Sequence, residues 1–340
     1  MTTPRYSIVI PTFRRGESLA ECLESLIALD YPHDRLEVVI IDNGGPAEHT
    51  RAAAEPFMDR LAIRYFVNVK NRGYGFSVNR GLVESRGDRI VILNDDARPA
   101  VDLFRRCDEL LDEDPSIGCV GCRAIEKGYI REGEGIGRLT ARGDVVANFD
   151  VDCGAPIEVE HVYGFCYVFT REALDRAGLN DRTLLAQPYS SGNRIETDHC
   201  LSIRRHGLKV VYHPAMVATH LAKPRPDMSE VSLRWHLNAI RNTLYLYLKH
   251  FGPFGRGGAA LRLTFLRDVG ILSTMRRPSR ANAAYFLMGL RARASAWGHW
   301  LKYLVVPGVD RPDAVRAVLE ADAREAAAAG QASPMSPSSR

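Results

Sequence analysis

The sequence predicts an α/β protein in which a mostly parallel sheet is flanked by helices and followed by a helical C-terminal extension. Short apolar runs rich in β-branched residues alternate with segments of helical periodicity, the pattern of βαβ units. The 340 residues suffice for one large domain with a full core and an extension. The chain is 46% hydrophobic and 25% charged and has no run of 18 apolar residues, so we expect a soluble protein without a membrane-spanning helix.

The expected strands of the parallel sheet are short, apolar and bounded by turn residues. Four such strands are expected, over residues 6–11, 36–41, 62–68 and 89–93. We expect a helix over residues 17–29, after the first strand, because Leu19, Leu23, Leu26 and Ile27 have helical spacing.

The second half of the chain predicts fewer strands and more helix. Residues 125–160 are glycine-rich and irregular, and a strand is expected over 162–170. Amphipathic helices are expected over 231–250 and 281–306, and the small, polar stretch from Ala326 predicts disorder. We therefore divide the chain into a sheet domain, a basic helical extension, and a terminal helix with a disordered tail. Their bounds are 1–225, 226–310 and 311–340.

The basic charge is concentrated in the extension. Residues 221–309 contain 14 Lys and Arg and three Asp and Glu, a net charge of +11, whereas the whole chain carries +4. Basic amphipathic helices with aromatic residues favour anionic bilayer surfaces, although such helices can equally pack on the sheet domain or on a second copy as a homo-oligomer. No nucleic-acid-binding motif is present. The aromatic residues concerned are Trp235, Tyr245, Tyr247, Trp297, Trp300 and Tyr303.

The cysteines indicate a reducing compartment. There are seven, an odd number at scattered spacing, which is typical of free thiols in a cytoplasmic protein. Cys119 and Cys122 form one CxxC, but no second ligand pair follows, so buried strand cysteines are favoured over a zinc site. The N-terminal segment reads directly into a strand and lacks a signal-peptide pattern.

Carboxylates follow two of the predicted strands. Asn94, Asp95 and Asp96 come directly after strand 89–93, and Asp42 closes strand 36–41. Ligands of parallel sheets bind at the carboxyl ends of the strands, where a carboxylate can hold Mg²⁺ or Mn²⁺ against a diphosphate or accept hydrogen bonds from a base or ribose. The alternative at both places is an ordinary turn or helix cap.

A second acidic cluster opens a predicted helix. Glu196 and Asp198 lie in its first turn, where a carboxylate can act as a general base or simply interact with the helix dipole. His213 and His220 flank an apolar, strand-like run, and His220 could lie near a metal or be structural.

Taken together, these motifs resemble glycosyltransferase family 2, the inverting enzymes of the GT-A fold. The order and spacing agree over about two thirds of the chain. The matching segments are SIVIPTFRR at 7–15, VIIDNGG at 39–45, NRGYGFSVNRGL at 71–82, ILNDD at 92–96, IETDHCLSIRRHGLKVVYHP at 195–214 and ATHLAK at 218–223.

The resemblance implies roles for matching positions. Asp96 and His220 would bind Mg²⁺ or Mn²⁺, and Gly164 and Phe165 would lie on the acceptor side. The nucleotide-binding set, with Asp42 on the base, would comprise Pro11, Thr12, Arg14, Asp42, Asn71, Gly73, Asn79, Asn94 and Asp95.

Two positions depart from the family pattern. Asn94 replaces the first Asp of the DxD motif, as in rhamnosyl- and galactofuranosyl-type polysaccharide transferases. The usual Glu-Asp-x-Asp reads Ile195-Glu196-Thr197-Asp198, so the base position falls on Glu196, whose longer side chain leaves open whether Glu196 or Asp198 is the base.

The resemblance thus implies an inverting, metal-dependent hexosyl- or deoxyhexosyltransferase of polysaccharide or glycoconjugate synthesis. It would use a UDP or dTDP sugar and a glycan, lipid-linked or small-molecule acceptor. We expect it in the cytoplasm, peripheral on the membrane face. A catalytically silent sugar-nucleotide-binding or scaffold protein is the alternative. A dinucleotide oxidoreductase is excluded, because the turn after the first strand, PTFRRGES, has one glycine rather than G-x-G-x-x-G.

Overall fold

The N-terminal half of the sheet is parallel, and three of its four strands are entirely buried. The computed structural model describes residues 3–44, 47–126, 135–185, 193–221, 230–265, 280–306 and 312–328. The first four strands lie side by side in the order β3-β2-β1-β4, all parallel, and every residue of β1, β2 and β4 is buried, as in sheets that helices cover on both faces. The four expected strands are confirmed as β1 (Tyr6–Thr12), β2 (Leu36–Asp42), β3 (Ile63–Val67) and β4 (Arg89–Leu93).

Beyond β4 the sheet becomes mixed. Strand β10 (Cys166–Thr170) lies antiparallel between β4 and β6 (Ile117–Glu126), and the long β11 (Lys209–His220) runs parallel to β6. Two short strands, β5 (Ala97–Pro99) and β9 (Ile157–Glu158), pair antiparallel with β11. Antiparallel insertion of β10 brings the residues before it, including Gly164, next to the carboxyl end of β4.

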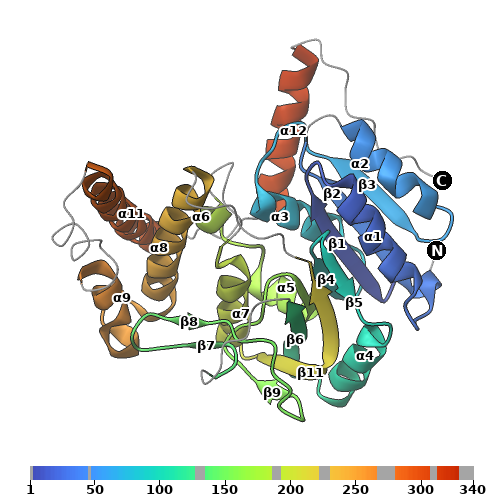
Figure 1. Ribbon diagram of the computed structural model, residues 1–340, viewed down its shortest axis with the longest axis horizontal. Helices are drawn as coiled ribbons and strands as arrows, with labels where there is room; N and C mark the ends of the chain where they lie inside the picture. The colour runs from blue at the N-terminus through green and yellow to red at the C-terminus, as the bar shows by residue number, and fades with distance from the viewer. Residues whose placement is uncertain are drawn as a thin grey trace.

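Helices flank the sheet (Figure 1). Helix α3 packs across β1 and β2 and approaches closely at Gly81, where a Cβ would lie 2.1 Å from Val9 Cγ1. The helices of this part are α1 (Gly16–Ile27), α2 (Ala47–Ala54), α3 (Tyr74–Glu84), α4 (Leu103–Glu113), α5 (Arg171–Ala177), α6 (Arg182–Leu185) and α7 (Ile195–Arg205), with 3-10 turns at His33–Arg35 and Glu55–Phe57. A separate hairpin pairs β7 (Arg138–Leu139) with β8 (Val145–Val146).

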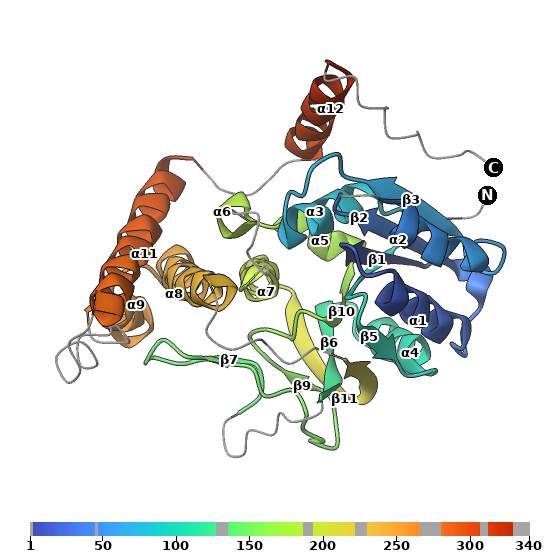
Figure 2. The same ribbon diagram turned by 45° about the horizontal axis from the view of Figure 1, so that its top comes forward.

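The C-terminal helices divide into two groups. Helices α8 (Glu230–Phe251), α9 (Gly255–Phe265) and α11 (Arg280–Val305) pack together beside α7 around a second apolar cluster (Figure 2). Helix α12 (Pro312–Ala328) instead returns to the sheet domain, where it contacts α3 and places Val315 in the main core. The two long helices expected from the sequence are thus present as α8 and α11, whereas α9 was not expected. Residues 326–328 belong to α12, and the rest of the expected disordered tail lies outside the described residues.

Five of the six aromatic residues named above for the extension lie in its apolar core or pack against it. Tyr245 and Tyr247 are 1% and 0% exposed, and Trp297, Trp300 and Tyr303 pack against the second cluster. The possibility that Tyr245 and Tyr247 are membrane anchors is therefore wrong, because the second half of α8 is buried by its neighbours. Trp235 lies outside the residues whose side chains are described. None of the helices in the described part is long and apolar enough to cross a membrane.

Candidate active site

Two neighbouring strand ends meet at the centre of the site. Thr12 ends β1 and pairs with Asp42 at the end of β2. The Thr12 hydroxyl donates a 2.8 Å hydrogen bond to Asp95 Oδ2, which ties the end of β1 to the turn after β4. The parallel order of the strands thus gathers carboxylates from distant segments at one edge, as the sequence predicted.

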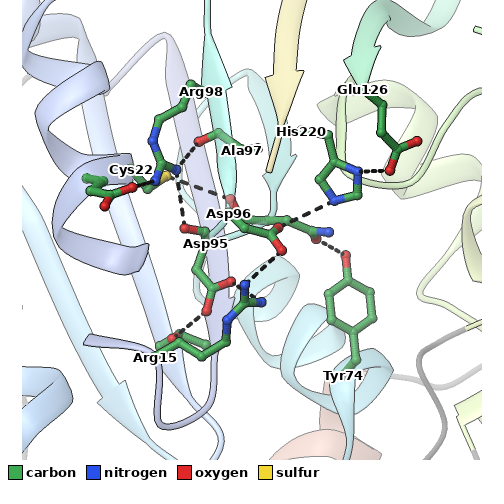
Figure 3. A network of polar contacts seen from close by, with 12 residues as sticks. Arg15, Cys22, Tyr74, Asp95, Asp96, Ala97, Arg98, Glu126 and His220 are labelled. Atoms are coloured by element: carbon green, nitrogen blue, oxygen red, sulfur yellow. Dashed lines mark hydrogen bonds and ion pairs between the residues drawn. The ribbon is translucent and has the colours of Figure 1, made fainter. Parts of the chain in front are cut away.

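An arginine joins the carboxylates that follow β4 (Figure 3). Arg15 Nη1 lies 2.9 Å from Asp95 Oδ1, and Arg15 Nη2 lies 2.8 Å from Asp96 Oδ2. On the other side, His220 Nε2 is 3.5 Å from Asp96 Oδ1, and His220 Nδ1 is 3.0 Å from Glu126 Oε1. Residues from the first, fourth, sixth and eleventh strands or their ends therefore form one network.

The two aspartates differ in acidity although they are adjacent. Burial raises the pKa of Asp95 to about 6, against the opposing influence of Arg15 and Thr12. Burial would also raise the pKa of Asp96, but the neighbouring His220 and Arg15 outweigh it and hold the pKa below its usual range. Asp96 therefore stays ionised at neutral pH.

Asp96 and His220 fit a divalent cation. Asp96 Oδ1 is buried without a hydrogen-bond partner. A proton on His220 Nδ1, donated to Glu126, leaves the Nε2 lone pair directed at Asp96, the arrangement of a metal-bound histidine held by an outer carboxylate. The described residues contain no group of three or more His, Cys, Asp or Glu that could hold a metal, so the remaining ligands would have to come from water and substrate phosphates, as Mg²⁺ sites commonly have them.

Asp42, at the end of β2, is buried and held by hydrogen bonds. It is 1% exposed and accepts a 2.8 Å hydrogen bond from the Tyr65 hydroxyl. Burial raises the pKa of Asp42, whereas the bonds from Tyr65 and the Gly44 backbone lower it. Gly44 has a φ of 90°, and a Cβ there would lie 2.8 Å from Asn68 O, so the turn requires glycine.

The loop before α3 is fastened to the same turn. Asn43 Nδ2 donates to Asn71 Oδ1 at 2.8 Å, and Asn71 Oδ1 also accepts the Gly73 amide at 2.9 Å. The Arg72 guanidinium forms a two-point ion pair with Asp322 of α12, whose side chain is 3% exposed. Helix α12 thus holds the loop of residues 71–73.

Glu196 faces the strand ends from α7. A Cβ on Gly164 would lie 3.1 Å from the Glu196 carboxylate, so the absence of a side chain at position 164 makes room for it. The Tyr74 hydroxyl bonds to Asn94 Oδ1 at 2.9 Å and to Gly164 O at 3.3 Å, which joins this side to the turn after β4. Burial raises the pKa of Glu196, as suits a proton acceptor near neutral pH.

Asp198 is in a different environment. Its side chain is 4% exposed, and it accepts hydrogen bonds from Lys249 Nζ at 2.8 Å and His250 Nε2 at 2.7 Å. Burial would raise its pKa, but these two groups hold it below the usual range. Asp198 is therefore occupied by the second helical layer, whereas the described residues give Glu196 a 3.5 Å hydrogen bond from the Thr197 hydroxyl and the nearby positive charge of Arg194.

The remaining residues that the sequence suggested for the site differ in whether they lie near the strand ends. Asn79 is 0% exposed and bonds through its amide to Asn180, so the structure does not bring it to the strand ends. Phe165 is buried, with its ring 4.7 Å from that of His220. Arg14 is exposed and stacks on Phe13, and Pro11 is buried within β1. His213 lies within β11, beside the shift in register between His213 and Val217, whereas His220 ends the strand.

Sequence reasoning missed Arg15, Tyr74 and Glu126. Arg15 lies within the segment SIVIPTFRR, but the sequence does not distinguish it from Arg14. The backbone of the turn does, because Arg14 has a left-handed φ of 54° and its side chain is exposed. Tyr74 was read only as part of a loop. Glu126 lies in a stretch read as irregular, whereas it ends β6 beside β11.

The chain matches known sugar transferases over its sheet domain. Residues 7–177 match the family model described as Glycosyl transferase family 2. Among curated proteins, the chain is 29% identical over 101 residues to Glycosyltransferase AglE of Haloferax volcanii, which covers 29% of this chain and 32% of that protein. It is 28% identical over 132 residues to a glucosyl-dolichyl phosphate glucuronosyltransferase of the same organism, which covers 38% and 41%. The chain thus spans about a third to two fifths of these relatives.

Solved structures share the fold over nearly the whole chain. The mannosyltransferase PcManGT from Pyrobaculum calidifontis, in complex with GDP-Man and Mn²⁺, has a TM-score of 0.51 at 19% identity and covers 96% of this chain and 81% of its own. TarS of S. aureus with UDP-GlcNAc has a TM-score of 0.58 at 14% identity and covers 98% and 94%. At these identities the likeness establishes the GT-A fold.

Proposed function

The chain belongs to glycosyl transferase family 2, and from that premise we propose that it transfers a sugar from a nucleoside-diphosphate donor to an acceptor hydroxyl with inversion. The observation that carries the proposal is the convergence of Asp42, Asp95 and Asp96 at neighbouring strand ends, opposite the Glu196 carboxylate. Parallel α/β sheets bind ligands at this edge. The donor sugar and its base stay open between UDP and dTDP sugars.

The donor would lie across the strand ends. Asp42 would accept hydrogen bonds from the base, with Thr12 and the loop of Asn71 and Gly73 lining the site. A divalent cation held by Asp96 and His220, Mg²⁺ or Mn²⁺, would supply positive charge that stabilises the diphosphate leaving group. Structures of PcManGT and of GalNAc-T7 contain Mn²⁺, which supports this assignment. Arg15 would hold Asp95 and Asp96 in place.

Glu196 would be the general base. It would take the proton of the acceptor hydroxyl as that oxygen forms a bond to the anomeric carbon and the bond from this carbon to the phosphate oxygen breaks. The nucleoside diphosphate then leaves with the electron pair. The raised pKa of Glu196 supports this residue as the base over Asp198, which is paired with Lys249 and His250 and whose pKa is held below its usual range.

The outer face of the extension would dock on an anionic membrane surface. Eight large hydrophobic residues between positions 254 and 306 are exposed, and the described stretches 231–265 and 280–306 contain Lys and Arg but no Asp or Glu. Apolar side chains with positive charge are the chemistry of interfacial helices. The exposed residues are Phe254, Phe265, Leu287, Leu290, Leu301, Leu304, Val305 and Val306. A lipid-linked or glycan acceptor at the cytoplasmic membrane face would fit this position.

The decisive experiment combines binding and turnover. Thermal unfolding is measured with UDP, dTDP and GDP, each with Mn²⁺ or with EDTA, because a ligand that binds only the native state raises its melting temperature. We expect one nucleotide to raise the melting temperature with Mn²⁺ but not with EDTA, and we expect sugar donors that carry this nucleotide to be consumed. A nucleotide that binds while no donor is turned over with any acceptor would indicate a silent sugar-nucleotide-binding protein. Full turnover in EDTA would exclude the metal.

A further inference from the structure

Helix α8 contacts both described ends of the segment that leads into α7. Arg241 Nη2 donates to Thr183 O at 2.9 Å, and Asn242 Nδ2 donates to Asn193 O at 2.8 Å. Thr243 Oγ1 accepts a 3.1 Å hydrogen bond from Arg194 Nε. Two consecutive residues of one helix thus bond to the backbone on either side of this segment, and the next residue bonds to the Arg194 side chain.

The residue that begins α7 has an unusual backbone. Arg194 precedes the helix with a φ of 74°, in the left-handed region that residues with a side chain rarely adopt. Such a conformation persists only where its surroundings enforce it, and these conformations are found disproportionately at functional sites. Its side-chain bond to Thr243 is one such constraint, and Glu196 lies two residues further on.

The end of α8 holds α7 by a buried charge cluster. Lys249 Nζ lies 2.8 Å from a carboxylate oxygen of Asp198 and 2.8 Å from Asp181 Oδ2. The side chains of Lys249, Asp181 and Asp198 are 1%, 0% and 4% exposed, and Tyr245 donates a further 2.8 Å bond to Asp181. His250 Nε2 lies 2.7 Å from Asp198 Oδ1. Charge-assisted hydrogen bonds among buried groups fix geometry more narrowly than apolar contacts do.

Stability alone does not account for this cluster. Buried ion pairs can often be replaced by well-packed apolar side chains without loss of stability, so their presence calls for another reason. Here that reason is geometric, because the place of the Glu196 carboxylate opposite Gly164 depends on the backbone of α7. Helix α8 fixes this backbone before Glu196 through the bond from Asn242 to Asn193 O, and it holds α7 after Glu196 through the pair of Lys249 with the Asp198 side chain.

We propose that helix α8 belongs to the catalytic apparatus and that Lys249 is a positioning residue, which acts through Asp198 to hold Glu196 against the acceptor side of the site. This rests on the proposed role of Glu196 as the base. The C-terminal extension then has a direct part in turnover, in addition to any part in docking.

The test is a double-mutant cycle between the cluster and the base. Asp198→Asn keeps the shape of the side chain and leaves Asp181 paired with Lys249, so this variant is expected to fold; Lys249→Met is the more severe change. We expect Asp198→Asn to lower kcat about tenfold with the KM for the donor changed by less than twofold. In the Glu196→Gln background the same change should lower kcat by less than twofold, because residues that act as a unit are not additive.

A matched control is available on the same helix. Tyr247 is 0% exposed, and its hydroxyl donates to Thr140 O and Asp144 O on the side of the β7–β8 hairpin. Tyr247→Phe should lower the melting temperature and leave kcat unchanged. A tenfold loss with Asp198→Asn that persists in the Glu196→Gln background, or an unchanged kcat in folded Asp198→Asn, would overturn the inference. Full activity of Glu196→Gln would instead contradict the proposed base.

Discussion

The sheet domain and the C-terminal extension expose opposite kinds of chemistry. Within the described residues, the sheet domain exposes only three large hydrophobic side chains, whereas residues 254–306 expose eight. The sheet domain gathers carboxylates at its strand ends, while the described parts of α8 beyond Glu230, α9 and α11 carry no Asp or Glu. The three exposed residues of the sheet domain are Phe13, Val101 and Leu221.

The difference indicates a division of work. The proposed donor side is built by parallel strands whose ends coincide, so the polar groups there are set by the fold itself. The proposed acceptor side is assembled by contacts between separate layers, in which α8 bonds to α7 while α9 and α11 expose apolar and basic side chains. Changes on the donor side should therefore abolish chemistry, and changes in the extension should modulate it.

The largest effect is expected at Asp96. Asp96→Ala removes the carboxylate that would bind the cation, and we expect kcat to fall on the order of 10³-fold, because a metal ion stabilises transition-state charge by several kcal/mol. The far-ultraviolet circular dichroism should be unchanged. Asp152→Ala is the control, since this carboxylate is exposed and pairs only with Arg123 in the described part of the chain. Full activity of Asp96→Ala would show that the donor side works without this ligand.

Glu196→Gln tests the other side of the site. We expect turnover to fall by roughly 10²-fold or more, as for loss of a general base, with nucleotide binding nearly unchanged. Because burial raises the pKa of Glu196, its carboxylate is protonated at pH values where an ordinary glutamate is ionised. The acid limb of kcat/KM should therefore lie above pH 4.5 in the wild type and disappear in the variant. If Asp198→Asn alone abolishes turnover and Glu196→Gln does not, the base is Asp198.

Vesicle binding tests the outer face of the extension. Arg291 and Lys302 are exposed on α11, and each Lys or Arg near an anionic bilayer contributes about 1 kcal/mol. Replacing both by Gln should weaken co-sedimentation with anionic vesicles about 30-fold, and salt should weaken the wild type as well. Replacing Arg60 and Arg86, which are exposed on the sheet domain, should have no effect. Equal absence of the wild type from anionic and neutral vesicle pellets at low salt would leave an enzyme with a soluble acceptor.

The smallest effect is expected at α12. Asp322→Asn weakens the ion pair with Arg72, so the loop of Asn71 and Gly73 is held less firmly. The KM for the donor should rise about threefold at unchanged kcat, because Arg72 is partly exposed and solvent screens the pair. The control is Glu320→Gln on the same helix: within the described residues Glu320 pairs with its helical neighbour Arg324, so this change should alter neither parameter. An unchanged KM in Asp322→Asn would mean that α12 is only a structural support.

The sequence was most informative where local pattern and topology coincide. Strand ends are visible in the apolar runs, and the rule that ligands bind there was enough to select Asp42, Asp95 and Asp96. The choice between Glu196 and Asp198 could not be made, because the partner that distinguishes them, Lys249, lies 51 residues further along the chain. Likewise Tyr245 and Tyr247 have the same spacing whether they face lipid or a core, and only the packing of α11 and α9 against α8 decides between these alternatives.

The pairing of Arg72 with Asp322 also sets an order of events during synthesis. The two residues are separated by 250 positions, and a ribosome delivers every strand of the sheet before it reaches α12. Domains fold from the N-terminal side as they emerge, so the sheet and its carboxylates can be complete while the loop beside them is still unfastened. A chain that ends between β11 and residue 322 would carry Asp42, Asp96 and Glu196 but not the residue that fastens Arg72. The contact that fastens Arg72 beside the proposed donor site is thus completed last, when translation has passed the helix farthest from the site in sequence.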